Sequence, residues 1–235
     1  MKLLFFSLAC ACAAQVASAA ESLATPGRLL LSEDFRTERT YTKEFAPLAP
    51  GWRVRAWHAE WVRTDEGLQS KWTSGHMPVL ALEGEAQDVV IELEFRFQAE
   101  AGKKAVCRVS ALNPKLAPRG YTVSAWANVD SRERPLGLSL EDDEWKPAKG
   151  FTTHARADLA LEPGRWHHLR LEVVGEWAQV SCNGVVIAAQ HAKFALPKTL
   201  FAIGTGLSPH EIRRVRIYEA IRNPAWKADA TPPVN

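Results

Sequence analysis

The sequence predicts an all-β protein, built as a sandwich of two packed antiparallel sheets. Apolar residues recur at every second position over most of the chain, which is the period of a strand with one buried face. No long segment sustains the three-to-four spacing of an amphipathic helix. Glycine, proline, asparagine and aspartate separate the alternating segments. Because so many strands exceed what one sheet holds, we expect two sheets that share a core.

The first residues are typical of a secretory signal peptide. Lys2 precedes an apolar run, and residues 17–19 are the small residues that a signal peptidase accepts. We therefore expect residues 1–20 to be removed and the protein to be exported, to the periplasm or outside the cell. A lipoprotein attached through Cys10 or Cys12 is the alternative, although the leucine-like residue usual before such a cysteine is missing. The apolar run is too short for a membrane span.

One domain is expected over residues 21–222, followed by a flexible proline-rich tail at 223–235. Residues 130–150 combine charge with turn formers and are expected to form a long loop, or a loop with a short hairpin. The strands are expected, in chain order, near 28–35, 52–64, 77–83, 88–98, 104–112, 120–129, 151–159, 165–174, 177–183, 185–190, 199–205 and 211–219.

Three successive strands in the middle of the chain carry most of the polar residues that could hold a ligand. In each strand the apolar phase faces the core, and the polar phase faces outward. If the three strands lie side by side, as short connections favour, their outward side chains form one surface. That surface would contain Glu92, Glu94, Arg96, Arg108, Ser110, Thr122, Ser124, Trp126 and Asn128.

Such a surface suits a saccharide, because hydroxyl groups need both hydrogen-bond donors and acceptors and a sugar ring can lie on an indole. We expect Glu92 and Glu94 to be the catalytic candidates, since two residues along a strand lie about 6.5–7 Å apart, near the spacing that glycosidases use. The expected saccharide-binding residues are Arg96, Arg108, Trp126 and Asn128, with Trp72 contributed by a loop. The competing interpretation is a solvated face with cross-strand ion pairs, such as Glu94 with Arg108.

The segment from Pro163 to Ile187 contains two adjacent histidines, but its pattern predicts a structural segment and not a catalytic site. Successive side chains of a strand point to opposite faces, so His167 and His168 cannot share a site. A second alternating strand follows, and Asn183-Gly184 supplies the positive φ angles of a two-residue hairpin turn.

Charge and spacing exclude several functions. Lys and Arg number 29 against 27 Asp and Glu, and this near balance argues against a nucleic-acid partner. The remaining histidines are scattered singly, so spacing proposes no metal site and we expect no cofactor. Calcium at Asp130, Asp142 and Asp143 is the alternative, but an acidic loop explains these residues better.

Two cysteines remain after the expected signal peptide, Cys107 and Cys182. Export makes a disulfide between them chemically allowed. Both stand on the apolar phase of alternating strands, so two buried free thiols are the competing interpretation.

The strand patterns also carry a family resemblance. Gly164 to Leu169, the glycine turn after it and the Asn-Gly hairpin resemble concanavalin A-like lectin and glucanase sandwiches, including laminin G-like domains. The segments from Leu29 to Phe35, Asp88 to Phe97, Leu196 to Gly206 and Arg213 to Ala220 resemble, in the same order, the bacterial secreted family named after 3-keto-disaccharide hydrolase. The resemblance covers most of residues 28–220. It implies a concanavalin-like jelly-roll sandwich that hydrolyses a glycosidic bond of a 3-keto or ordinary disaccharide.

The chain departs from the pattern of these relatives at two places. Thr122 stands where the family's strand carries a glutamate, and Phe97 stands at the third carboxylate position of the family 16 glucanase motif. Two other functions therefore compete with hydrolysis: a non-catalytic carbohydrate-binding module, and a cell-envelope domain that contacts another protein.

Overall fold

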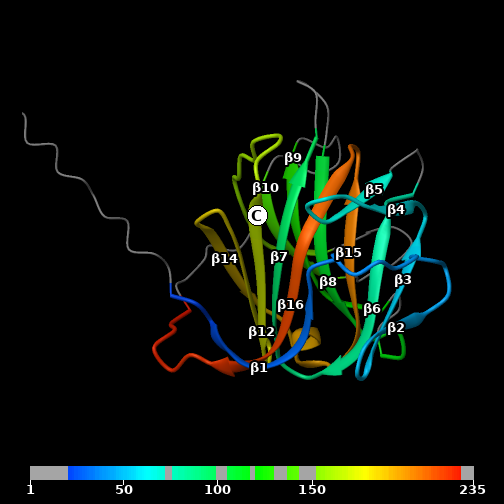
Figure 1. Ribbon diagram of the computed structural model, residues 1–235. Helices are drawn as coiled ribbons and strands as arrows, with labels where there is room; N and C mark the ends of the chain where they lie inside the picture. Colours follow the sequence, from blue (N-terminus) through cyan, green and yellow to red (C-terminus); the bar gives the residue numbers. More distant parts are fainter. Residues whose placement is uncertain are drawn as a thin grey trace, which may run out of the picture.

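The computed structural model describes residues 21–71, 76–98, 105–116, 120–129, 137–142 and 152–228. These residues form two antiparallel sheets of eight strands each, with one short 3-10 helix, η1 (Ala192–Ala195). The sheets face each other as two layers (Figure 1). The predicted all-β sandwich of two antiparallel sheets is confirmed.

Sheet A runs in the order β14-β13-β12-β7-β16-β5-β4, and β1 also pairs with β16. Its longest strand, β16, holds this sheet together by pairing with three others. The strands of sheet A are β1 (Ala24–Glu33), β4 (Glu60–Arg63), β5 (Leu68–Lys71), β7 (Val89–Phe97), β12 (His167–Val174), β13 (Trp177–Cys182), β14 (Val185–Gln190) and β16 (His210–Arg222).

Sheet B runs in the order β11-β10-β9-β8-β15-β6-β3-β2. Its last sequential strand, β15, lies in the middle, between β8 and β6. The strands of sheet B are β2 (Ala46–Ala49), β3 (Trp52–Trp57), β6 (Val79–Ala86), β8 (Ala105–Leu112), β9 (Tyr121–Val129), β10 (Gly137–Asp142), β11 (Thr152–Ala157) and β15 (Lys198–Gly206).

The strand expected at residues 52–64 is two strands that belong to different sheets. β3 pairs with β6 in sheet B, whereas β4 pairs with β5 in sheet A. Between them His58 has a φ of 65°, a left-handed conformation that a continuous strand cannot contain. Alternation alone does not reveal this crossing, because both strands keep the same period. The loop expected at 130–150 likewise contains a strand, β10.

The core lies between the two sheets and takes one face of nearly every strand. On β7 the apolar phase, including Phe95 and Phe97, is fully buried. On β8 and β9 the corresponding phase, including Val109 and Ala125, packs into the same cluster. Burying a Val, Leu, Ile or Phe side chain contributes roughly 1.5–3 kcal/mol. The outward phases of the two sheets therefore point away from each other.

The two ends of the described chain pack together on the outer face of sheet A. Leu23 and Ala24 join a small apolar cluster with Trp226, and the Trp226 indole donates a 2.6 Å hydrogen bond to Gln179. Residues 223–228, which the sequence assigns to a flexible tail, thus pack in part on the sandwich, because the large apolar ring of Trp226 lies edge-on against Trp177. None of the described segments forms a helix long and apolar enough to cross a membrane.

Cys107 on β8 and Cys182 on β13 are both buried, and both are free thiols. They face the core from opposite sheets. Burial raises the pKa of Cys182 to about 12, and burial, assisted by the nearby Cys182, raises that of Cys107 as well. Of the two predicted alternatives, the structure therefore contains the two buried free thiols and not the disulfide.

We expect both thiols to be present and unreactive in the folded protein, because the thiolate is the reactive form and burial suppresses it. For a chain beginning at Glu21, iodoacetamide at about pH 8 should add nothing to the native protein. In denaturant without reductant it should alkylate both cysteines, as read by intact mass. A denatured protein that remains unalkylated would instead contain the disulfide.

Candidate functional site

The single polar surface expected from three successive strands is divided between the two sheets. β7 pairs with β12 and β16 in sheet A, whereas β8 pairs with β9 and β15 in sheet B. Glu94 therefore points outward from one side of the sandwich and Trp126 from the other. The predicted adjacency of β8 and β9 is confirmed, but that of β7 and β8 is wrong, because the chain crosses from one sheet to the other after β7. Short connections favour adjacency, but a sandwich also uses them to change sheets.

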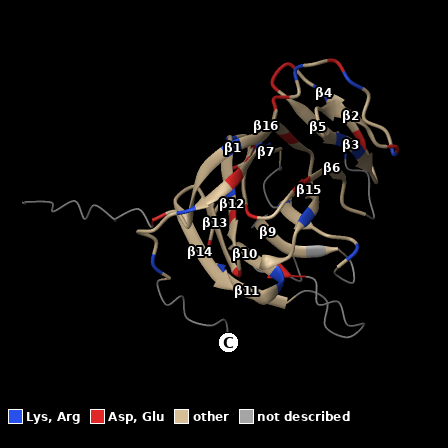
Figure 2. Ribbon diagram, turned by 90° about the horizontal axis from the view of Figure 1, so that it is seen from below, with Lys and Arg blue, Asp and Glu red and all other residues tan. Residues whose placement is uncertain are grey.

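The outer face of sheet A is a network of ion pairs. Glu94 lies 2.5 Å from Arg213 Nε and 2.6 Å from Arg214 Nη1. Glu92 lies 3.1 Å from Arg170 Nη1. Acidic and basic positions are interspersed along this sheet (Figure 2). Ion pairing was anticipated for this phase, but the suggested partnership of Glu94 with Arg108 is wrong, since Arg108 lies in the other sheet.

Glu92 and Glu94 are thus both engaged by arginine side chains. Burial alone would raise the pKa of Glu94, but the hydrogen bond from Arg213 and the charges of Arg213 and Arg214 outweigh it and lower that pKa below its ordinary value. Glycoside hydrolysis needs one carboxyl group with a raised pKa as proton donor. Arg96, expected to bind saccharide, also belongs to this network, donating 2.7 Å from Nε to Glu211. All three residues belong to the ion-pair network of sheet A, and their catalytic and saccharide-binding roles stay predictions.

The segment around the adjacent histidines behaves as the predicted scaffold. His167 is 4% exposed, whereas His168 is exposed on the opposite face of β12. The Asn183 amide donates to His167 Nδ1 at 2.8 Å, so Nε2 carries the proton and donates to the Glu162 carbonyl at 2.9 Å. Burial lowers the pKa of His167, which favours this neutral tautomer.

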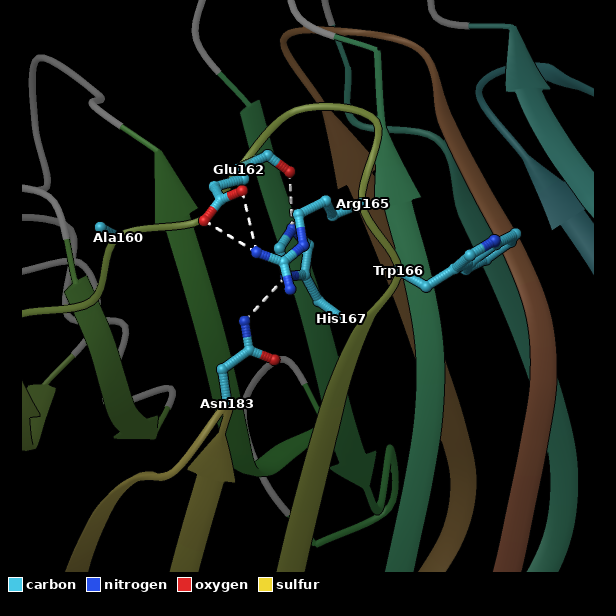
Figure 3. Close-up of a pocket in the computed structure, with 6 residues that line it drawn as sticks. All are labelled: Ala160, Glu162, Arg165, Trp166, His167 and Asn183. Carbon is cyan, nitrogen blue, oxygen red and sulfur yellow. Dashed lines mark hydrogen bonds and ion pairs between the residues drawn. The ribbon is translucent and has the colours of Figure 1, made fainter.

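A hollow of about 410 Å³ lies beside this histidine. Its polar groups bond to one another: Arg165 bridges both oxygens of Glu162 at 2.9 Å. Figure 3 shows the Trp166 ring pointing away from the other lining side chains; it lies instead under Arg96 and Arg213. With its hydrogen-bonding groups already engaged, the hollow offers little to a ligand.

The outer face of sheet B differs from that of sheet A, because small residues occupy its centre. Strand register aligns Arg108 with Trp126 on one side and with Gly204 on the other. We call this surface the Arg108 face, and it consists of two rows of residues that run across the strands. The first row is Ser139, Trp126, Arg108, Gly204, Val79 and Trp57. The second row is Glu141, Ser124, Ser110, Ala202, Ala81 and Arg55.

Polar and aromatic side chains flank this small centre. The Arg108 guanidinium lies 4.9 Å from the centre of the Trp126 ring. On the other side of the face, the Arg55 guanidinium lies 3.6 Å from the centre of the Trp57 ring. A Cβ atom at Gly204 would stand 2.7 Å from Met77 Sδ and 3.2 Å from Arg108 Nε. Because glycine has no Cβ atom, the Arg108 side chain can pack directly against β15 at this position.

The structure brings together two of the predicted saccharide-binding residues, Arg108 and Trp126. They are 5% and 4% exposed, so the indole is enclosed rather than open to solvent as expected. The Trp72 residue and the Asn128 side chain lie outside the described residues. Sequence reasoning missed Trp57 and Arg55, although their alternation with the buried Val54 and Ala56 marks them as outward.

Comparisons with known proteins agree with this architecture. The sequence model of a family described as the 3-keto-alpha-glucoside-1,2-lyase-like domain matches residues 44–216. No curated protein matches the chain. The resemblance predicted from the strand motifs is thereby confirmed.

Several solved structures share the fold at low sequence identity. Carbohydrate-binding module CBM66 from Bacillus subtilis is 16% identical with a TM-score of 0.55, over 72% of this chain and 96% of that one. SCLam, a non-specific endo-β-1,3(4)-glucanase of family GH16, is 12% identical with a TM-score of 0.60, over 86% and 94%. A LamA variant from Z. galactanivorans in complex with laminaritriose and laminaritetraose is 13% identical with a TM-score of 0.55, over 83% and 100%. The concanavalin-like jelly-roll fold is confirmed.

The lowered pKa of Glu94 leads to a prediction about acid stability. Since the folded-state pKa is below the ordinary value of 4.5, the stabilisation is complete above that value and is lost as the pH falls through the folded-state pKa. The urea midpoint of Glu94→Gln should be lower than that of the wild type near neutral pH, and the two should converge in acid. Glu162→Gln, which removes an exposed ion pair, should follow the wild type throughout. Parallel curves for Glu94→Gln and the wild type would show that the arginines do not stabilise this carboxylate.

Proposed function

The chain belongs to the 3-keto-alpha-glucoside-1,2-lyase-like domain family, and from this membership we propose that it binds a saccharide on the Arg108 face. The observation that carries the proposal is the register of β9, β8 and β15, which places an indole, a guanidinium and a glycine in one row. Two structures of the same fold support the proposal by analogy, since CBM66 is a carbohydrate-binding module and the LamA variant is in complex with laminaritriose and laminaritetraose.

The chemistry of the face suits sugar hydroxyls. The Arg108 guanidinium supplies several donors in a fixed plane, and Glu141 supplies acceptors. The hydroxyls of Ser110 and Ser124, 2.9 Å apart, can both donate and accept. At the centre, Gly204, Ala202 and Ala81 contribute little side-chain volume, and the flexible Met77 side chain, which lies over Gly204, would move aside for a pyranose ring. Since Arg108 and Trp126 are nearly enclosed, hydrogen bonds made there act in a water-poor environment and are stronger than at an open surface.

A second candidate function is elimination from a 3-keto glycoside, favoured by the position of Glu141. This carboxylate is 2% exposed, lies opposite Ser124 in the Arg108 face and accepts a 3.0 Å hydrogen bond from Ser139. A ketone at C3 makes the hydrogen on C2 acidic. Glu141 would remove that proton, C1 and C2 would form a double bond, and the bond from C1 to the leaving oxygen would break. The proton then passes to that oxygen, so no water is consumed.

Elimination needs one base, whereas hydrolysis uses two carboxyl groups at a set separation. The engagement of Glu92 and Glu94 in ion pairs therefore does not argue against this reaction. We propose Glu141 in their place as the carboxylate to test.

A direct test uses the mature protein with a 3-keto disaccharide and its unoxidised parent. Calorimetry measures binding, and the absorbance of the conjugated enone measures elimination. Binding without product indicates a carbohydrate-binding module. If a broad glycan array and both disaccharides show no binding, the saccharide proposal fails and a protein partner at the cell envelope is favoured.

A matched pair of glycines tests the site. Gly204→Ala should weaken saccharide affinity about tenfold, equivalent to ~1.4 kcal/mol, because the new methyl group displaces Arg108 and Met77 from the row. Gly206→Ala, on the same face of β15, meets Val106 only at an ordinary 3.4 Å and should bind like the wild type. If calorimetry gives equal affinities for the two variants, the saccharide does not bind on this face.

For the elimination reaction, Glu141→Gln should abolish enone formation while keeping saccharide binding within a few-fold, because the amide preserves shape but cannot accept the proton. Glu92→Gln should leave both binding and turnover unchanged, since its carboxylate lies on the other sheet. Full turnover in Glu141→Gln would exclude it as the base.

A further inference from the structure

We propose that Asp142, His154 and His191 form a site for a divalent transition metal ion such as Zn²⁺, at the margin where the two sheets meet. One ligand atom from each residue lies within 4.8 Å of the others. Asp142 ends β10, and His154 lies on the adjacent strand β11, both in sheet B. His191 follows β14 of sheet A and caps the N-terminus of η1. The proposal is independent of saccharide binding on the Arg108 face.

The two distances from Asp142 to the histidines match a tetrahedral site. Asp142 Oδ2 lies 3.4 Å from His154 Nε2 and 3.2 Å from His191 Nδ1. With metal–ligand bonds of about 2.0–2.1 Å, the ligand atoms of a tetrahedron stand roughly 3.3 Å apart. A carboxylate oxygen and two imidazole nitrogens are a ligand set that Zn²⁺ commonly uses, and they leave a fourth position open.

The hydrogen bonding of the cluster gives a second observation, because the charged Asp142 Oδ2 is approached only at 3.2–3.4 Å, by His154, His191 and Lys193. Asp142 is 0% exposed, and neither of its carboxylate oxygens has a hydrogen-bond partner; the buried Nε2 of His154 has none either. A buried carboxylate without hydrogen bonds is costly. A metal ion coordinated by Oδ2 and Nε2 would compensate both atoms at once.

The tautomer of His191 supports the same conclusion. Its Nδ1 accepts a long 3.4 Å hydrogen bond from the backbone N–H of Lys193, so Nδ1 carries a lone pair and no proton. An unprotonated nitrogen cannot donate to Asp142 Oδ2, which lies 3.2 Å away. A metal ion bound to both atoms would take the Nδ1 lone pair in place of the long bond from Lys193.

Packing presents the two histidine rings in fixed orientations. The rings of His154 and His191 lie 4.6 Å apart at 30°, and the buried Phe194 presents an edge-type contact to each of them. The three chain segments come from elements that Figure 2 shows side by side, β10, β11 and β14. A metal here would tie the edge strand of one sheet to the edge strand of the other.

Lys193 is the competing cation, since its Nζ lies 3.2 Å from the same Asp142 oxygen. Its side chain is a flexible four-carbon stem, so it can move out when a divalent ion binds. Water can then occupy the fourth position.

The test uses the mature protein after treatment with EDTA and a return of Zn²⁺ alone. One equivalent should bind by calorimetry, and the thermal midpoint should rise, because a ligand that binds only the folded state stabilises it. Ca²⁺, which prefers oxygen ligands, should produce neither effect. A protein that binds no Zn²⁺ overturns the proposal.

Variants locate the ion. His154→Gln and Asp142→Asn should each weaken Zn²⁺ affinity by about tenfold or more, since even outer partners of a metal ligand contribute that much. Lys193→Met should strengthen it by removing the competing charge. Circular dichroism of the metal-free protein checks that each variant is folded. If Asp142→Asn is not folded, His154→Gln alone tests the site, because His154 is partly exposed and its replacement disturbs the core less.

The matched control is a second histidine pair, His58 and His76, whose rings lie 4.9 Å apart on the surface. His58→Gln should leave Zn²⁺ affinity and the midpoint shift unchanged. Loss of Zn²⁺ binding in His58→Gln, with wild-type affinity in His154→Gln, would place the ion elsewhere and overturn the proposal. A lower affinity in Lys193→Met would overturn the proposed arrangement as well.

Discussion

Both sheets bury one face in the same core, and this shared core determines where anything else can happen. A strand that contributes alternate residues to the core has only its other phase left for function. Phe95 on β7 and Val109 on β8 belong to one cluster although they come from different sheets. Their neighbours Glu94 and Arg108 must therefore emerge on opposite sides of the molecule. The core thus separates residues that are close in sequence.

The polar side chains of the two outer faces are arranged differently. On sheet A, long acidic and basic side chains from β7, β12 and β16 neutralise one another, as Arg170 does between Glu92 and Glu172. Such a face satisfies its own hydrogen-bonding groups. On sheet B, the centre of the face is made of small residues, and the larger polar groups stand at its sides. The larger polar and aromatic groups thus converge on a centre with little side-chain volume, which is the arrangement typical of a site for a small ligand.

Periodicity explains why the fold was predictable and the site was not. The period of two reports which side of a strand a residue occupies, and it correctly placed Arg108 beside Trp126 and separated His167 from His168. It carries no information about which sheet a strand joins. That is why the change of sheet at His58 was missed, and why β7 was assigned to the wrong neighbours. The histidines near Asp142 were judged by spacing alone, yet strand pairing and the turn before η1 bring them together from distant positions.

One strand connects the proposed saccharide face with the proposed metal site. Glu141 and Asp142 are consecutive residues of β10, so they point to opposite faces of sheet B. Glu141 lies on the Arg108 face, while Asp142 turns inward, toward β14 and η1. This end of β10 pairs with β9 and β11 within sheet B, so contacts from Asp142 are what link it to the other sheet. An ion bound by Asp142 would anchor this end of β10 to the opposite sheet, and the same anchor would limit how far Glu141 can move relative to a bound sugar.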